Sequence, residues 1–129
     1  MPTSKQDIAV RSWLENARSD FELACVQKTR KIRYEHLCFH AQQAAEKAIK
    51  ALLLSCGNEV PRTHDLSYVI DALPVSLLIP PQLLLLPILT KYAVQFRYPG
   101  QETSVTRKEY LKAVELAQAT LDWVKDVIK

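Results

Sequence analysis

The fold of this chain is decided by the stretch Phe39-His40-Ala41-Gln42-Gln43-Ala44-Ala45-Glu46-Lys47-Ala48-Ile49-Lys50-Ala51-Leu52-Leu53-Leu54. Nearly every residue in it is a strong helix former, and it contains neither proline nor glycine. Apolar residues recur at the i, i+3, i+4, i+7 spacing of a wide buried stripe, namely Ala41, Ala44, Ala45, Ala48, Ile49, Leu52 and Leu53. We therefore predict a central helix from about Tyr34 to Ser55, whose small alanine face lets neighbouring helices approach closely.

The segments on either side of this helix also carry helical spacing and helix-start signals. Ser4 with Asp7 forms a capping-box pair, and the apolar spacing after it predicts a first helix to about Val26. After the central helix, Gly57 or Asn58 is suited to the left-handed conformation that ends a helix. Thr63 or Asp65 is placed to cap a short third helix that we expect to reach Leu73.

Two further helices complete the expected fold. One is predicted from about Pro81 to Phe96, with a kink or a restart at Pro87, and it is apolar nearly all round. The last begins at the capping box of Thr106 and Glu109 and continues to the C-terminus. We predict an all-α fold: an antiparallel up-and-down bundle of four long helices plus one short helix, forming one domain over residues 1–129.

Composition limits the classes of protein to consider. The chain has 129 residues and a net charge of +3, which permits a nucleic-acid partner without requiring one. Three cysteines without a CxxC pair favour a reducing, cytoplasmic setting. Four prolines interrupt the uncharged stretch before Lys91, so we expect no membrane span there. Burial of the apolar fourth helix on two sides favours a second subunit, the alternative being burial inside its own bundle.

Common catalytic and cofactor motifs are absent, and we expect no cofactor. His36 and His40 are four residues apart but lack a third ligand at matching spacing, so no metal site is expected. The basic segment from Lys28 to Arg33 is interpreted as a solvated loop, with a nucleic-acid contact as the alternative. His64 is interpreted as a hydrogen-bonding residue at a helix start, with a catalytic role as the alternative.

Tyr92, Arg97 and Tyr98 lie together near the end of the fourth predicted helix. An arginine between two tyrosines is suited to grip a phosphate while a ring stacks on a base. The alternative is an arginine that pairs with a carboxylate and braces the following loop. Composition does not choose between the two interpretations.

Several of these segments, in this order, resemble the HEPN domain family. The run from Cys38 to Leu52 is similar to its signature helix, and it is followed by Pro61-Arg62-Thr63-His64-Asp65-Leu66 and by Tyr92 with Arg97-Tyr98-Pro99. The resemblance covers essentially the whole chain. It implies a helical bundle that forms a homodimer. Many members act with a minimal nucleotidyltransferase as a toxin–antitoxin pair, and others are metal-independent ribonucleases.

This chain departs from the pattern of the ribonuclease members. In those, an arginine followed by four to six residues and then a histidine assists attack by the RNA 2′-hydroxyl on its own phosphate. Arg97 matches the arginine, but positions 102, 103 and 104 are occupied by Glu102, Thr103 and Ser104. The resemblance therefore implies a weakly active or non-catalytic protein, with a metal-independent endoribonuclease toxin as the alternative.

The leading hypothesis is a homodimer that binds a nucleotide or an RNA phosphate and associates with a minimal nucleotidyltransferase. The ligand-binding residues expected from the resemblance and from the residue types are Arg97, Tyr98, Tyr92, Gln43, Lys47, Lys50 and His64.

Overall fold

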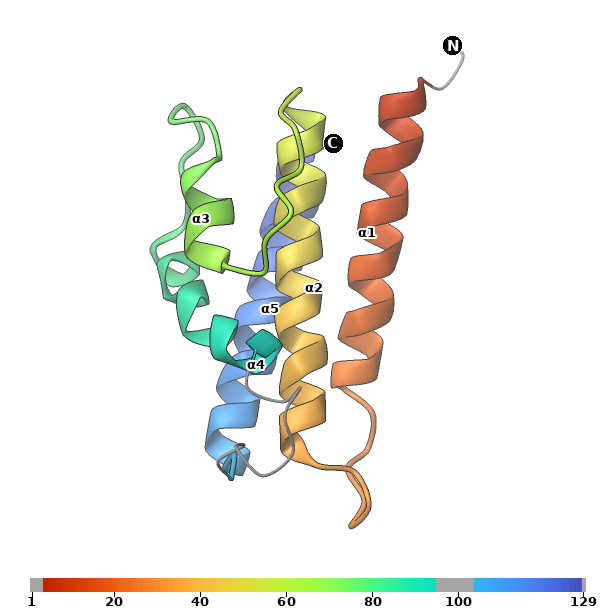
Figure 1. The fold of residues 1–129 in the computed structure, drawn as a ribbon, viewed down its shortest axis with the longest axis vertical. Coiled ribbons are helices and arrows are strands. Elements are labelled where there is room, and N and C mark those ends of the chain that lie inside the picture. The colour runs from red at the N-terminus through yellow and green to blue at the C-terminus, as the bar shows by residue number, and fades with distance from the viewer. Residues whose placement is uncertain (1–3, 95–103, 129) are drawn as a thin grey trace.

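A computed structural model describes residues 4–94 and 104–128 of the chain. The helices are α1 (Lys5–Ala24), α2 (Tyr34–Ser55), α3 (Leu66–Asp71), the 3₁₀ helix η1 (Pro81–Leu89), α4 (Thr90–Val94) and α5 (Arg107–Ile128). The long helices α1, α2 and α5 run side by side, and α3, η1 and α4 pack along one side of the bundle (Figure 1). The described residues form no strand, which confirms the predicted all-α fold. None of their helices is both long and apolar enough to cross a membrane.

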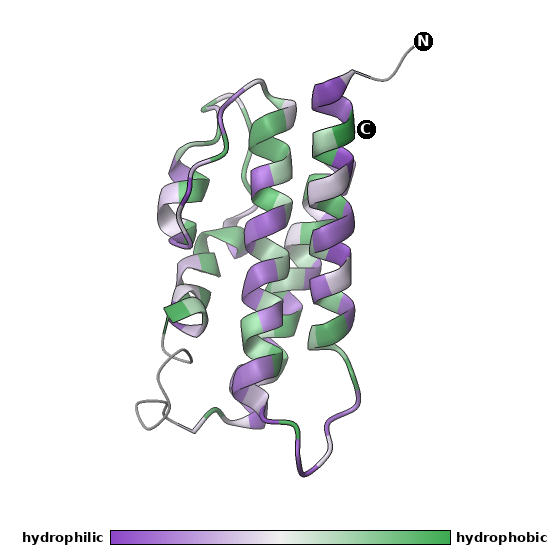
Figure 2. Ribbon diagram, turned by 45° about the vertical axis from the view of Figure 1, so that its right-hand side comes forward, coloured by the Kyte–Doolittle hydropathy of each residue, from purple (hydrophilic) through white to green (hydrophobic). Residues whose placement is uncertain are grey.

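Helix α2 is the centre of the bundle. It contacts α1 and α5 extensively and also touches α3, η1 and α4. The alanines of its inner face have no exposed surface, namely Ala41, Ala44, Ala45 and Ala48. Along the long helices hydrophobic and hydrophilic residues alternate, as expected when one face is buried (Figure 2). The stretch that predicted the central helix therefore forms the core of the structure.

The predicted helix starts and the turn after α2 are found at the expected residues, whereas α1 and α3 each end two residues earlier than predicted. Ser4 and Asp7 form a reciprocal capping box at the start of α1. At α3 the Oδ1 atom of Asp65 accepts a hydrogen bond from the backbone N–H of Ser67, so Asp65 is the cap. Gly57 adopts a φ of 84°, in the left-handed region that favours glycine after a helix. The side chains of Ser4, Asp7 and Asp65 bind backbone groups that a helix end leaves without partners. Gly57 instead allows the chain to turn away after α2.

The segment predicted as a fourth long helix is divided into η1 and α4. Pro87 has no N–H to donate, and its ring crowds the carbonyl four residues earlier, so a regular α-helix does not form through it. The segment keeps the tighter 3₁₀ turn to Leu89 and becomes α-helical only from Thr90. The predicted interruption is confirmed, whereas the predicted end at Phe96 lies outside the described residues.

Candidate functional site

A groove of about 740 Å³ lies between α4 and the first turns of α5. Its apolar lining includes Ile88, Leu89, Leu111 and Ala113, which come from η1 and α5. Four cationic side chains line it as well, namely Lys91, Arg107, Lys108 and Lys112, together with Glu109 and Glu115. The groove therefore combines an apolar wall with an excess of positive charge, a combination that suits a phosphate-bearing ligand with an apolar part.

Tyr92, one of the predicted ligand-binding residues, lines this groove but is only 4 % exposed. Its hydroxyl interacts with the thiol of Cys38, a fully buried residue near the start of α2. Burial raises the pKa of the Tyr92 phenol above its ordinary value, so the hydroxyl stays protonated at neutral pH. Tyr92 is thus part of the groove wall, and its hydroxyl is directed at Cys38 of α2.

Burial also raises the pKa of the Cys38 thiol, to about 12. A thiol whose pKa is raised by folding stabilises the native state fully below its unfolded pKa of about 9 and loses that contribution as pH rises towards 12. We expect native protein at pH 8 to react with a thiol reagent at the two exposed cysteines, Cys25 and Cys56, and to spare Cys38 until denaturant is added. Equal labelling rates at all three cysteines in native protein would contradict this assignment.

Arg97 and Tyr98, the other two residues of the predicted phosphate grip, lie in the 95–103 segment, outside the described residues. Described residues before and after that segment, Lys91 and Tyr92 on α4 and Arg107 and Lys108 on α5, border the same groove. The role of Arg97 and Tyr98 stays a prediction.

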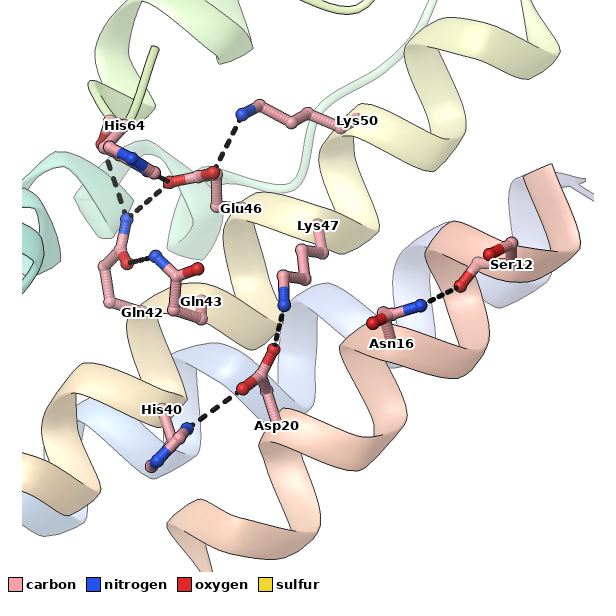
Figure 3. A network of polar contacts seen from close by, with 10 residues as sticks. All are labelled: Ser12, Asn16, Asp20, His40, Gln42, Gln43, Glu46, Lys47, Lys50 and His64. Atoms are coloured by element: carbon pink, nitrogen blue, oxygen red, sulfur yellow. Dashed lines mark hydrogen bonds and ion pairs between the residues drawn. The ribbon is translucent and has the colours of Figure 1, made fainter. Parts of the chain in front are cut away.

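The second group of predicted ligand-binding residues meets in a polar network on α2 (Figure 3). Its centre is Glu46, whose side chain is almost fully buried. Oε2 of Glu46 is 2.8 Å from Nζ of Lys50, and Oε1 is 2.9 Å from Nδ1 of His64. Nε2 of Gln42 donates to Oε1 of Glu46 at 3.0 Å and also lies 3.4 Å from the backbone oxygen of His64. Nε2 of Gln43 in turn donates to Oε1 of Gln42 at 2.7 Å.

A parallel arrangement joins α1 to α2. The two carboxylate oxygens of Asp20 are 2.9 Å from Nδ1 of His40 and 2.6 Å from Nζ of Lys47. Asp20 is buried, so this paired charge lies within the packed interface of the two helices. Each of the two carboxylates therefore holds one lysine and one histidine (Figure 3).

The structure brings some predicted site residues together and separates others. Gln43, Lys50 and His64 belong to one network, and Lys47 lies beside it with Asp20 as its partner. Tyr92 contacts α2 at Cys38, and Lys47 is nine residues further along that helix, which places it about 180° around the helix axis. Tyr92 therefore packs on a different side of α2 from the polar row formed by Gln43, Lys47 and Lys50.

Sequence reasoning missed the two carboxylates that organise these networks and the cations of the groove. Glu46 is visible as a neighbour of Lys50 at i+4, which is a surface pattern in most helices. In the fold, however, Glu46 is buried beside His64 of the 61–65 segment, and this burial is not visible in the sequence. Lys91, Arg107, Lys108 and Lys112 are spread over two helices, so no local motif marks them.

Comparison with known proteins places this arrangement in a family. A model of the HEPN domain matches residues 10–127. The chain belongs to the HEPN family. The crystal structure of TT1696 from Thermus thermophilus is similar to this HEPN protein, with 34% sequence identity, a TM-score of 0.79 and coverage of 91% of this chain and 96% of that one.

A second solved structure, that of ST0689, an archaeal HEPN homologue, is 30% identical with a TM-score of 0.72. The match covers 93% of this HEPN protein and 98% of that chain. A search of curated proteins found no significant match. The resemblance inferred from the central helix and from the segment around His64 is therefore confirmed at the level of family and fold.

Proposed function

We propose that this HEPN protein is a homodimer that binds a phosphate group of a nucleotide or of RNA and associates with a minimal nucleotidyltransferase in a toxin–antitoxin-like pair. The observation that carries the proposal is the groove between α4 and α5, which joins four cations to an exposed apolar surface. A cytoplasmic setting, favoured by three free cysteines, belongs to the same proposal.

Phosphate binding rests on the charge of the groove. Lys91 lies 3.8 Å from Glu109, a partly exposed pair that contributes little stability and is easily exchanged for a ligand. Arg107, Lys108 and Lys112 form no ion pair with another described residue. A phosphate is the natural counter-ion for such a group, because it accepts several charge-assisted hydrogen bonds at once. Arg97 would add a further cation, as its position in the family motif suggests.

Dimerisation rests on the apolar residues beside these cations. Leu84, Leu85 and Ile88 of η1 and Leu111 of α5 are each at least 45 % exposed. Soluble proteins rarely leave such neighbouring apolar side chains in water unless they serve an interface. A second copy that covers this surface would bring the cations of both copies to the edge of one cleft.

The experiment that tests the proposal measures binding and cleavage with one set of proteins. Purified wild-type protein and its Arg97→Ala variant are incubated in EDTA with labelled RNA and, separately, titrated with a nucleotide. We expect no cleavage and binding that weakens about tenfold or more in the variant, because one charge-assisted contact is worth about 1.5–3 kcal/mol. Cleavage that disappears in the variant would instead support the endoribonuclease toxin.

The partner is tested by co-expression with a nucleotidyltransferase encoded next to this chain. We expect the two proteins to purify together and the HEPN protein to elute as a dimer in size-exclusion chromatography. A monomer that binds neither nucleotide, RNA nor such a partner would overturn the proposal.

A further inference from the structure

The basic loop of residues 25–33 and the cationic groove lie at the same end of the bundle. The loop joins α1 to α2, and Figure 1 shows it at the lower end of the molecule, where α5 begins. It contributes Lys28, Arg30, Lys31 and Arg33, all exposed. The groove contributes four more cations from α4 and the start of α5. Two basic groups that are far apart in sequence thus occupy one end of the fold.

Specific contacts fix the loop against α5. The hydroxyl of Tyr110 donates to the backbone oxygen of Ala24 at 2.7 Å, and the rings of Tyr34 and Tyr110 are 5.2 Å apart. The backbone N–H of Val105 donates to Oε1 of Glu35 at 3.2 Å. These bonds link both ends of the loop to the start of α5 and the residues just before it, so the position of the loop relative to α5 is built into the fold.

Most of the positive charge at this end is not neutralised by the chain itself. Arg33 pairs with Glu35 at 2.5 Å. Arg30 and Lys31 form no ion pair with any residue the structure describes, and the same holds for Lys28. Nζ of Lys28 instead lies 4.8 Å from the ring centre of Tyr34. Two acidic residues, Glu109 and Glu115, stand against the four cations of the groove.

We infer that the ligand of the groove is a single strand of nucleic acid that continues from the groove onto the loop of residues 25–33. This inference rests on the proposed function and names its substrate class. Cations on two separate elements exceed what the phosphates of one nucleotide can contact, whereas a strand offers one phosphate per nucleotide. The half-buried Tyr34–Tyr110 ring pair, with Lys28 over one ring, lies beside the loop and offers it an aromatic surface for an unpaired base.

The test compares two triple variants that each remove three exposed cations. Lys28→Gln/Arg30→Gln/Lys31→Gln neutralises the loop, and Lys5→Gln/Arg11→Gln/Lys125→Gln does the same at the other end of the bundle. Fluorescence anisotropy follows binding of 2-, 6- and 12-nucleotide strands of oligouridylate and of the matching DNA over a salt series. A mononucleotide titration provides the reference for the groove alone, and thermal unfolding confirms that both variants are folded.

We expect affinity to rise with strand length in the wild type and in the control variant. In the loop variant the 12-nucleotide strand binds about tenfold or more weakly, and the slope of log Kd against log salt falls by about 2, since each lost contact to a single strand removes about 0.7. Mononucleotide binding stays unchanged. The DNA strands show whether the 2′-hydroxyl contributes.

Two results would overturn the inference, and they are distinguishable. Mononucleotide binding with no gain from strand length, or equal salt slopes in the two variants, contradicts the extension onto the loop and leaves the proposed phosphate site standing. Wild-type protein that binds neither mononucleotide nor strand removes the proposed function and the extension together.

Discussion

Replacing Glu46 by alanine is expected to lower the free energy of unfolding by about 3–5 kcal/mol, the cost of breaking a buried ion pair from one side. The variant leaves the ammonium of Lys50, which is 5 % exposed, without the carboxylate 2.8 Å away. His64 and Gln42 lose their shared acceptor as well. In a chain of this size we expect the melting temperature to fall on the order of 10–20 °C, measured by circular dichroism or calorimetry.

A matched control and a rescue make this result specific. Glu15→Ala removes an exposed glutamate from the middle of α1 and should change stability by no more than about 0.5 kcal/mol. The double variant Glu46→Met/Lys50→Met removes both charges and should recover part of the loss, since apolar residues often replace a buried ion pair without penalty. If Glu46→Ala behaves like Glu15→Ala, the carboxylate is not buried and paired as described.

The second large effect is expected at Leu86, which is fully buried in η1. Truncation to alanine removes its packing and leaves a cavity, at a cost of about 2–5 kcal/mol. Because η1 is a 3₁₀ helix interrupted by proline, it has little stability of its own and depends on side chains such as this one. Denaturant unfolding at equilibrium measures the change in free energy.

Leu84 is the matched control for Leu86. It lies two residues earlier in the same helix but is 60 % exposed, so Leu84→Ala should leave the unfolding free energy of the monomer nearly unchanged. The same variant should weaken self-association, measured by analytical ultracentrifugation, because Leu84 belongs to the proposed dimer surface. If both variants destabilise the monomer equally, η1 packs differently from the structure described.

The fold is readable from the sequence because its signals are local. Helix spacing in residues 39–54, the capping pairs Ser4–Asp7 and Thr106–Glu109 and the glycine at 57 each act within a few residues. The 3₁₀ geometry of η1 is predicted only in part, since Pro87 predicts an interruption of the α-helix but not the 3₁₀ helix that forms there. Local signals therefore predict the starts of α1, α2, α3 and α5 and the end of α2, whereas the boundary between η1 and α4 is not predicted.

The site is less readable, because its parts come from distant segments. In the sequence Lys47 and Lys50 belong to one polar row. In the fold Lys47 pairs with Asp20 of α1, and Lys50 pairs with the buried Glu46. Tyr92 is grouped with that row by residue type, and only the packing of α4 against Cys38 shows that it faces another side. Contacts between residues so far apart in the chain produce no recognisable residue spacing in the sequence.

The order of the helices also bears on how the chain folds. Helices α1 and α2 are joined by the short 25–33 connection and make more contacts with each other than any other pair. Contacts between neighbours in sequence close small loops and cost little entropy, so this hairpin is the natural nucleus. Helix α5 is separated from α2 by residues 56–106 and docks on a surface that the hairpin has already formed. During synthesis the part of α2 that α5 covers therefore stays exposed to water until α5 leaves the ribosome, and in that interval chaperones or a partner chain have access to it.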